Sequence, residues 1–587
     1  MKKTGAWLVR YALEQLDIRF TFGIPGVHNT EIYDEINTSD SIEPVLVTHE
    51  GCGAFMADAV SRTSGSVGAL LIVPAAGVTH AASGIGEAFL DGIPMLVIAG
   101  GIRSDSEYKY QLHDIDQHAL LKPITKACYK ISNQNEILST FYEAYEVATS
   151  GEPGPVFIEV PVNIQLYAGD IGSLQPYADY RQKKSSNSVN LLSTEIDSAV
   201  TLLLEAKSPG LFLGWGAVDV SYETSRIAEL LGAPVSTTLQ GLSAFPANHE
   251  LHTGMSFGPA AVPAATNAFK NCDALLAVGT RFAEIATGSF GVTVPEKLIH
   301  VDINPNAINA NYPAQVAIEG DANVILPLLL SRLEQILDER QLSFSSKRRE
   351  VAAAVKLDKD AYRAEWYAHS VKGKVNPARF FDALRLKLPD DGLIVVDDGN
   401  HTFLTAELMG IHSPRGMISP TDFNCMGYAV PATIATKLAN PDKDVVSIIG
   451  DGAFLMTCME LLTANHKNVG AVFTIFNDGE LSQISQAQAL PYNRKTCTVL
   501  PETKFQGVAL ATGVEYIRME TNDDIVTKLE EAWSISKMGR PVILDVNIDY
   551  SKKTRFTQGI VGTNLKRLPY KSKIKMVGRA LVRKVTG

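Results

Sequence analysis

Two acidic residues, Asp451 and Asp478, lie 27 residues apart, and each comes at the end of an aliphatic run. Such runs are typical of buried parallel strands, whose carboxyl ends meet at one edge of a sheet. Two carboxylates at that edge suit Mg²⁺, which leaves its other coordination positions to phosphate oxygens and water. The pattern therefore predicts a metal site, although a Gly-Asp-Gly turn such as 450–452 also occurs by chance between a strand and a helix.

The elements that must position these residues come from an alternation of short aliphatic runs and helical patterns. The chain of 587 residues is too long for one hydrophobic core, so we expect several domains. This alternation predicts an α/β fold built from doubly wound parallel sheets. The runs expected to form strands are 67–73, 95–99, 156–160, 211–213, 274–278, 393–396, 445–449, 471–476 and 542–546.

Two polar stretches interrupt the alternation. Residues 177–190 lack aliphatic periodicity and are expected to form a linker, and residues 343–360 are charged and helical in pattern. The domains that we predict are 1–180, 190–342 and 360–550, each a doubly wound parallel sheet, followed by a basic carboxyl-terminal arm, 551–587.

The composition indicates a cytoplasmic globular protein. Hydrophobic residues make up 45% of the chain and charged residues 20%. No apolar run reaches the ~18 residues expected of a membrane span, and the amino-terminal residues lack the apolar core of a secretory signal. The six cysteines are scattered without CxxC spacing, as expected of reduced thiols rather than of a disulfide framework or a zinc site.

The charge of the chain is unevenly distributed. The net charge is −11, but residues 551–587 hold eleven Lys or Arg and no Asp or Glu, so residues 1–550 carry −22. A basic arm can bind nucleic acid or a lipid surface. We favour an arm folded onto the acidic body, and expect no nucleic-acid partner, because it contains apolar residues that a solvated tail does not need: Phe556, Leu565, Leu568, Tyr570 and Val577.

The aspartates and their neighbours resemble the motif of thiamine-diphosphate-dependent enzymes, in which Gly-Asp-Gly is followed at this distance by an Asn-Asn pair. Here Asp478 replaces the second Asn, and a carboxylate remains an oxygen ligand. The resemblance implies that Mg²⁺, held by Asp451, Asp478 and the carbonyl of Glu480, binds the diphosphate of the cofactor. It also implies cofactor contacts from the segments that resemble the other family motifs: Pro25, Gly26, Gly399, Asn400, His401, Asn424, Met426, Gly450, Gly452 and Ala453.

Glu50 opens a predicted helix after an expected strand at 44–48. A glutamate in that place can simply favour the positive end of the helix dipole. The segment 49–62, however, resembles the pattern that carries the activating glutamate of acetolactate synthase and its relatives. The resemblance implies that Glu50 contacts N1′ of the aminopyrimidine, and that Met426 supports the bent cofactor. In this family the glutamate and the metal site meet across a subunit interface, which implies a homodimer or homotetramer.

Substrate contacts are predicted at His28 and Gln111. His28 follows the turn 25–27, where benzaldehyde lyase and cyclohexane-dione hydrolase resemble this chain in having histidine, and an imidazole can relay protons. The alternative for His28 is an ordinary surface-loop residue. Gln111 resembles the substrate-side glutamine of the acetolactate synthases, and His113 is a further polar candidate near it.

Three departures separate the chain from typical acetolactate synthases. Val162 replaces a lysine, Ala487 replaces the tryptophan that favours a 2-ketobutyrate acceptor, and Ser256-Phe257 replaces the His-Gly of a middle-domain segment. The first two changes are expected to open the substrate pocket. The third disfavours bound FAD, and the partial dinucleotide fingerprint at 214–219 leaves FAD open, because its third glycine is missing.

The function that we expect is a Mg²⁺- and thiamine-diphosphate-dependent 2-keto acid decarboxylase or carboligase, similar to acetolactate synthase. One alternative is a thiamine-dependent lyase or hydrolase that cleaves a carbon–carbon bond of a diketone or acyloin, which His28 favours. Another is a noncatalytic FAD- or nucleotide-binding regulatory protein, against which Glu50 and both metal carboxylates argue.

Overall fold

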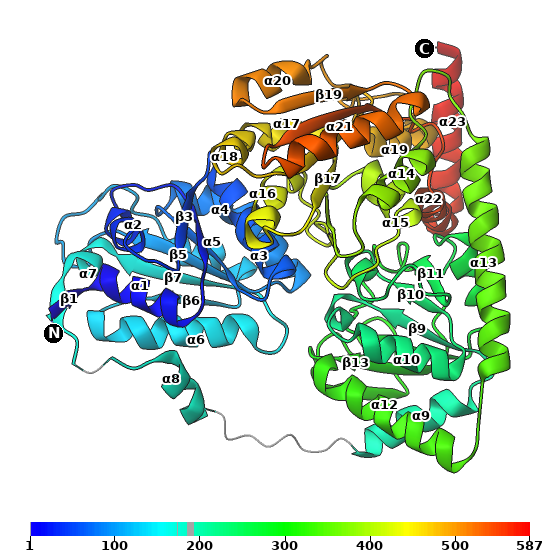
Figure 1. Cartoon of the computed structure of the whole chain (residues 1–587), viewed down its shortest axis with the longest axis horizontal. Helices are drawn as coiled ribbons and strands as arrows, with labels where there is room; N and C mark the ends of the chain where they lie inside the picture. The colour runs from blue at the N-terminus through cyan, green and yellow to red at the C-terminus, as the bar shows by residue number, and fades with distance from the viewer. Residues whose placement is uncertain (1, 173, 185–192, 587) are drawn as a thin grey trace.

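The computed structural model describes residues 2–172, 174–184 and 193–586 (Figure 1). These residues form three six-stranded sheets in which all paired strands are parallel, together with a two-stranded antiparallel sheet of β1 (Lys2–Thr4) and β8 (Ala168–Asp170). Helices separate most successive strands along the chain, but the last three strands of the middle domain follow one another without an intervening helix. The predicted α/β fold with three doubly wound sheets is confirmed.

The first sheet has the strand order β3-β2-β4-β5-β7-β6. Its strands are β2 (Phe20–Gly23), β3 (Glu43–Leu46), β4 (Gly68–Ile72), β5 (Met95–Gly101), β6 (Ala127–Lys130) and β7 (Pro155–Pro161). The helices of this domain are α1 (Gly5–Gln15), α2 (Thr30–Ile36), α3 (Glu50–Thr63), α4 (Ala76–Asp91), α5 (Gln117–Leu121), α6 (Ile137–Thr149), α7 (Val162–Leu166) and α8 (Tyr177–Lys184). Residues 177–184 were expected in a linker and form α8, while 185–190 lie outside the described residues.

The middle sheet has the order β11-β10-β9-β12-β13-β14, which is the strand order of dinucleotide-binding folds. Its strands are β9 (Pro209–Leu213), β10 (Val235–Thr237), β11 (His252–Met255), β12 (Ala274–Val278), β13 (Lys297–Asp302) and β14 (Val316–Glu319). The accompanying helices are α9 (Ser193–Glu205), α10 (Ser221–Leu231), α11 (Pro263–Ala268) and α12 (Ala322–Glu339), and the long α13 (Ser345–Ala368) leads to the third domain.

The third sheet, β16-β15-β17-β18-β20-β19, repeats the topology of the first. Its strands are β15 (Leu393–Val396), β16 (Met417–Ile418), β17 (Val445–Gly450), β18 (Val472–Asn477), β19 (Glu515–Met519) and β20 (Val542–Asn547). The helices are α14 (Pro377–Lys387), α15 (Asn400–Leu408), α16 (Ala429–Ala439), α17 (Asp451–Thr457), α18 (Leu461–His466), α19 (Ser482–Tyr492), α20 (Phe505–Thr512) and α21 (Ile525–Lys537).

In each sheet the direction of strand addition reverses beside the first strand of the six, between β2 and β4, between β9 and β12, and between β15 and β17. Ligands of open α/β sheets bind outside the carboxyl ends of the strands at such points. The loops that follow these strands include His28 in the first domain, 214–216 and 279–281 in the second, and 399–401 and 450–452 in the third. The topology therefore gives each domain one candidate ligand position.

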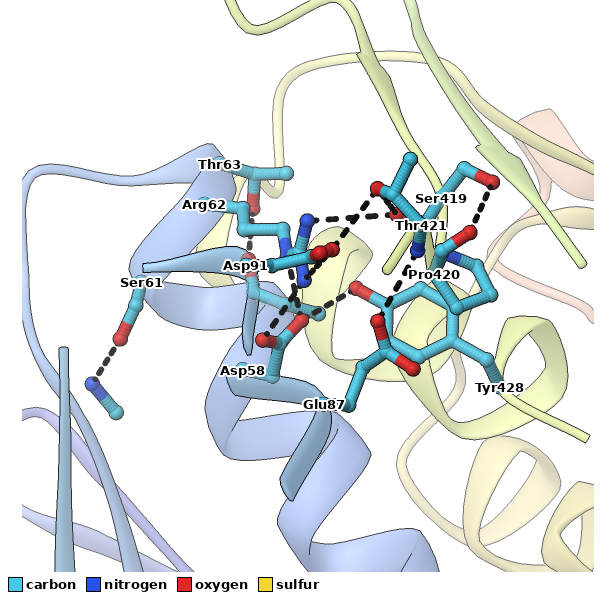
Figure 2. Close-up of polar contacts among 12 residues, drawn as sticks. Asp58, Ser61, Arg62, Thr63, Glu87, Asp91, Ser419, Pro420, Thr421 and Tyr428 are labelled. Carbon is cyan, nitrogen blue, oxygen red and sulfur yellow. Dashed lines mark hydrogen bonds and ion pairs between the residues drawn. The ribbon is translucent and has the colours of Figure 1, made fainter. Parts of the chain in front are cut away.

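The first and third domains share a hydrophobic core across helices α3 and α16, with Phe55 and Tyr428 in edge-to-face contact at 5.4 Å between ring centroids. A buried polar cluster lies at the same junction (Figure 2). Arg62 pairs with Asp58 at 2.7 Å and with Asp91 at 2.9 Å, and Tyr428 donates to Asp58. We call Asp58, Arg62, Glu87, Asp91, Thr421 and Tyr428 the interface cluster.

The carboxyl-terminal arm forms α22 (Arg555–Arg567) and α23 (Tyr570–Thr586), which lie against the body (Figure 1). Of the apolar anchors predicted for the arm, Phe556 is buried, whereas Leu568 and Tyr570 are exposed. Phe556 stacks on Phe403 at 4.3 Å between ring centroids. In α23, Arg579 and Arg583 donate to the carbonyls of Pro491 and Tyr492 at the end of α19, where a helix terminus attracts cations. No helix in the described ranges has the length and apolar character needed to cross a membrane.

Candidate active site

A cavity of about 150 Å³ lies at the reversal point of the third sheet. All eleven residues predicted to bind cofactor or metal in this domain line it: Gly399, Asn400, His401, Asn424, Met426, Gly450, Asp451, Gly452, Ala453, Asp478 and Glu480. They come from loops after β15, β17 and β18 and from the loop before α16. Residues up to 81 positions apart in sequence therefore meet, because parallel strands deliver their carboxyl ends to one edge.

Asp451 is the first residue of α17 and is 3% exposed. One carboxylate oxygen accepts the N–H of Gly452 at 2.8 Å, and the other accepts the N–H groups of Asp478 and Gly479 at 3.1 and 2.7 Å. Burial raises the pKa of Asp451, and these backbone donors oppose that shift. The carboxylate thus joins the two loops that the sequence pattern predicted to meet.

Asp478 follows β18 and faces the same cavity. Its Oδ2 accepts the hydroxyl of Ser482, while its buried Oδ1 has no hydrogen-bond partner. Burial, with the neighbouring charges of Asp451 and Glu480, raises its pKa to about 7. An unpaired buried carboxylate oxygen is costly unless a cation or donor fills the site.

Glycines border the cavity in the turns after β15 and β17. Gly399 has φ 151°, and a Cβ on Gly450 would lie 2.9 Å from Cε1 of His401. His401 is buried, and burial lowers its pKa to about 3, so the ring is neutral. Its Nε2 accepts the N–H of Gly450 at 3.3 Å. These glycines keep the cavity open to a ligand that contacts backbone.

The loop before α16 places Asn424 and Met426 at the cavity. Asn424 has φ 66°, a left-handed conformation that asparagine tolerates better than most residues. Asp397, which is fully buried, accepts the N–H groups of Gly427 and Ala429 at 2.9 and 2.7 Å and so fixes the loop. The sequence reasoning missed Asp397, although its place directly after the strand β15 was a signal.

The donor set of this cavity fits Mg²⁺ and a diphosphate. The described residues contain no group of three or more His, Cys, Asp and Glu side chains arranged for a metal. A site with two carboxylates, Asp451 and Asp478, instead leaves coordination positions for phosphate oxygens, which is the usual pattern for Mg²⁺. The unpaired Oδ1 of Asp478 is the atom that calls for such a cation.

Glu50 lies elsewhere, at the amino terminus of α3 in the first domain, and is 7% exposed. His80 bonds one of its oxygens, with Nδ1 and Oε2 2.9 Å apart, and stacks on His49 at 4.7 Å between ring centroids. The second oxygen faces Gly77, where a Cβ would approach to 3.4 Å. His80 thus orients Glu50 and leaves one oxygen for a ligand. The sequence reasoning did not identify His80, which lies 30 residues away on another helix.

His28 is 9% exposed and does not lie on the open surface. It contacts His113 edge-to-face at 5.2 Å, and its buried Nδ1 has no hydrogen-bond partner. Burial, with the nearby charge of His113, lowers its pKa. Gln111 is partly exposed and donates to the carbonyl of Arg103 at 3.1 Å. The structure therefore brings the loops of His28 and His113 together, with Gln111 beside them in sequence.

Pro25 and Gly26 belong to the turn after β2, at the reversal point of the first sheet. Asn29 shapes this turn by accepting the N–H of Gly26 at 2.7 Å, and a Cβ on Gly26 would lie 2.5 Å from Val73. Neither these residues nor Glu50, His28 and Gln111 line the cavity of the third domain. In one chain, the predicted residues thus form two separate half-sites.

A larger cavity of about 570 Å³ lies at the reversal point of the middle sheet and is lined by residues of all three domains. Residues 214–216 and 279–281 line it, as the dinucleotide-like strand order predicts. Six carboxyl groups but only two guanidinium groups face it: Asp91, Glu152, Asp219, Asp302, Asp321 and Asp422, against Arg281 and Arg415. Arg281 pairs with Glu152 and Asp422, and Arg415 pairs with Asp219, so part of this negative charge is compensated at the cavity itself.

Comparison with known proteins identifies three matching family models, which follow each other along the chain. "Thiamine pyrophosphate enzyme, N-terminal TPP binding domain" matches residues 3–120, "Thiamine pyrophosphate enzyme, central domain" matches 196–329, and "Thiamine pyrophosphate enzyme, C-terminal TPP binding domain" matches 397–546. The cavity of the third domain lies within the last match, apart from Tyr550.

Curated relatives of similar length also match. The chain is 30% identical to the acetolactate synthase large subunit of Haemophilus influenzae, over 94% of this chain and 96% of the relative. It is 32% identical to a probable acetolactate synthase large subunit of Methanocaldococcus jannaschii, over 93% and 92% of the two chains. The acetolactate synthase large subunit of Corynebacterium glutamicum is 30% identical, over 93% and 86%.

Proposed function

Because this chain belongs to the family of thiamine pyrophosphate enzymes, we propose that it joins or cleaves carbon–carbon bonds of 2-keto acids in the manner of an acetolactate synthase. The observation that carries the proposal is the convergence of Asp451, Asp478 and the predicted diphosphate contacts on one cavity. When bound, the thiazolium ring of thiamine diphosphate supplies an electron sink for the carbon that loses CO₂.

We propose that Asp451, Asp478 and the carbonyl of Glu480 hold Mg²⁺. The Glu480 side chain is engaged elsewhere, in an ion pair with Lys495, which supports a role for its backbone oxygen alone. His401 is neutral and Asn424 lies on a fixed turn, so both can orient a ligand without adding charge. Met426 supplies the apolar surface for the rings.

Glu50 is proposed to act as the proton-exchanging carboxyl group of the site. Its oxygen that faces Gly77 is free to contact a ring nitrogen, and His80 holds the other oxygen. The half-site of Glu50 and the cavity of Asp451 lie on different domains, and no residue of the first domain lines that cavity. This separation supports a homodimer, or a homotetramer built from dimers, in which a second copy supplies Glu50.

The substrate side is proposed to include His28, with Gln111 and His113 from the neighbouring loop. The unpaired Nδ1 of His28 can accept or donate a proton near a reacting carbonyl. Ala487 and Val162 remove a bulky and a cationic side chain from positions that resemble substrate contacts, so a wider acceptor range is expected. The relatives favour a carboligase over a lyase of diketones and over a noncatalytic regulatory protein.

FAD is not part of the proposed reaction. The position of the middle cavity favours a dinucleotide, but the loop at 214–219 lacks the third glycine of a dinucleotide fingerprint. An absorption spectrum of the purified protein, before and after denaturation, would reveal a flavin.

We also propose a cytoplasmic location, since all six cysteines are free.

The proposal is tested by supplying the protein with Mg²⁺, thiamine diphosphate and a panel of 2-keto acids, alone and with aldehyde or keto-acid acceptors. Mass spectrometry of the products, together with CO₂ release, identifies donor and acceptor. We expect CO₂ and a coupled product from at least one small 2-keto acid. Cleavage of acyloins or diketones without CO₂ release from any keto acid would instead support the lyase alternative.

Glu50→Gln tests whether Glu50 of one copy and the cavity of Asp451 in a second copy form one active site. We expect turnover to fall by about three orders of magnitude or more, because a proton-transfer group contributes about 10²–10⁴-fold. Cofactor affinity is expected to change little.

Co-expression of the Glu50→Gln and Asp451→Ala chains is expected to restore part of the activity, because one of the two sites in a mixed dimer is intact. Without any such rescue, the two half-sites do not belong to one active site.

A further inference from the structure

Three buried side-chain atoms at the cavity of the third domain lack hydrogen-bond partners: Oδ1 of Asp478, Oε1 of Gln483 and the hydroxyl of Tyr550. Most buried polar atoms in proteins are paired, so three unpaired atoms around one cavity call for a ligand. Asp478 belongs to the proposed metal site. Gln483 and Tyr550 have no role in any motif that the sequence reasoning used.

Tyr550 is held firmly in place. It follows β20, is 9% exposed, and belongs to the hydrophobic core of the third domain. Its ring contacts Phe476 edge-to-face at 6.3 Å between centroids, and Gln486 of α19 donates to its carbonyl at 3.1 Å. The Phe476 contact and the surrounding core therefore hold the ring, the Gln486 hydrogen bond holds the backbone, and the hydroxyl remains without a partner.

The hydroxyl is the donor among the three unpaired atoms. A carboxylate oxygen and an amide oxygen can only accept, whereas a phenol donates its O–H. A tyrosine phenol keeps its proton at neutral pH, so the Tyr550 hydroxyl is available as a donor. A ligand that matches both kinds of atom presents a cation to Asp478 and an anionic oxygen to Tyr550.

We propose that Tyr550 is a further cofactor-binding residue, whose hydroxyl donates to a phosphate oxygen of the Mg²⁺–diphosphate group. The assignment rests on the proposed function, since it needs thiamine diphosphate in this cavity. A hydrogen bond from a neutral donor to a charged acceptor is among the stronger ones in proteins. Tyr550 thus adds a neutral donor to a cavity whose lining holds four carboxyl groups, those of Asp398, Asp451, Asp478 and Glu480, and no Lys or Arg.

The test compares Tyr550→Phe with the unmodified protein, both freed of cofactor. The dissociation constant of thiamine diphosphate, measured by calorimetry at fixed Mg²⁺, is expected to rise ~10-fold or more. Inorganic diphosphate with Mg²⁺, used as a second probe, is expected to lose the same factor because the contact is to the phosphate group. The melting temperature of the cofactor-free protein is expected to stay level or rise, because the lost hydroxyl had no partner.

Tyr142→Phe is the matched control. Tyr142 is also buried, but its hydroxyl donates to the carbonyl of Gln175 at 2.9 Å. Neither residue lines the cavity of the third domain. This variant is expected to melt at a lower temperature and to bind the cofactor normally.

Equal cofactor affinity in Tyr550→Phe and the unmodified protein would overturn the assignment of Tyr550 and leave the proposed function standing. A loss for thiamine diphosphate but not for inorganic diphosphate would also overturn it. If the unmodified protein does not bind thiamine diphosphate at all, the proposed function fails together with this inference.

Discussion

The cavity of the third domain and the interface cluster are both rich in buried charged groups. They differ in how many of the buried polar atoms have hydrogen-bond partners. Each guanidinium nitrogen of Arg62 donates to a partner: Nε to Asp58, Nη1 to Ser419, and Nη2 to Asp58 and Asp91 (Figure 2). No side-chain atom of the cluster is unpaired, whereas the cavity holds three unpaired atoms.

This difference distinguishes polar groups that hold the domains together from polar groups that can bind a ligand. A fully paired buried network keeps the domains in one arrangement and leaves no unpaired donor or acceptor for a ligand. A cavity with unpaired acceptors and one unpaired donor carries a desolvation cost that a bound ligand would remove. Charge and burial alone would have ranked the two regions alike, whereas the pairing of their buried polar atoms differs.

The largest effect is expected from Arg62→Met. The substitution leaves Asp58 and Asp91 buried without their cation, and losing one partner of a buried pair costs about 3–5 kcal/mol. Denaturant unfolding measures this loss. Arg103→Met is the control, because its pair with Asp105 is exposed and such pairs contribute about 0–1 kcal/mol. Equal losses for the two variants would mean that the interface cluster does not hold the domains together.

A smaller effect is expected from Glu87→Gln. Both oxygens of Glu87 accept backbone N–H groups, from Thr421 at 3.1 Å and Cys425 at 3.0 Å. A glutamine would direct an NH₂ at one of these donors and leave it unpaired, at a cost of about 1–3 kcal/mol. Because the same loop carries Asn424 and Met426, thiamine diphosphate affinity is expected to fall as well. Loss of stability with fully normal cofactor affinity would show that the loop keeps its shape without Glu87.

The smallest effect is expected from Asp478→Asn. The amide oxygen of asparagine still coordinates Mg²⁺, and the change restores the residue of the family motif. We expect thiamine diphosphate affinity within about threefold of the unmodified protein, a difference below about 0.7 kcal/mol. Parallel titrations at saturating Mg²⁺ measure it. Complete loss of cofactor binding would mean that Asp478 has a task that only a carboxylate fulfils.

Prediction from sequence succeeded where chemistry is encoded by short segments. The spacing of Asp451 and Asp478, each after an aliphatic run, predicted that the two residues meet, and the structure places both at one cavity. The motif around Met426 predicted its position there as well. Each of these inferences needed only a strand, a turn and the rule that parallel strands end at a common edge.

Prediction failed for residues whose importance depends on distant partners. Tyr550 follows a strand like many other residues, and only its packing against Phe476 directs its hydroxyl to the cavity. His80 bonds Glu50 from a different helix, and Asp397 fixes the loop of Asn424 from a different strand end. No local pattern distinguishes these side chains from ordinary helix or loop residues.

By itself, the sequence determined the α/β class, the three parallel sheets and the residues of the predicted metal site. These follow from local periodicity, glycine-containing turns and the residue types that chemistry requires. Only the tertiary structure decided the strand orders, the pairing of the interface cluster, the separation of the two half-sites and the unpaired hydroxyl of Tyr550. The physical reason is that burial and hydrogen-bond satisfaction are properties of the packed chain, set by contacts between residues far apart in sequence.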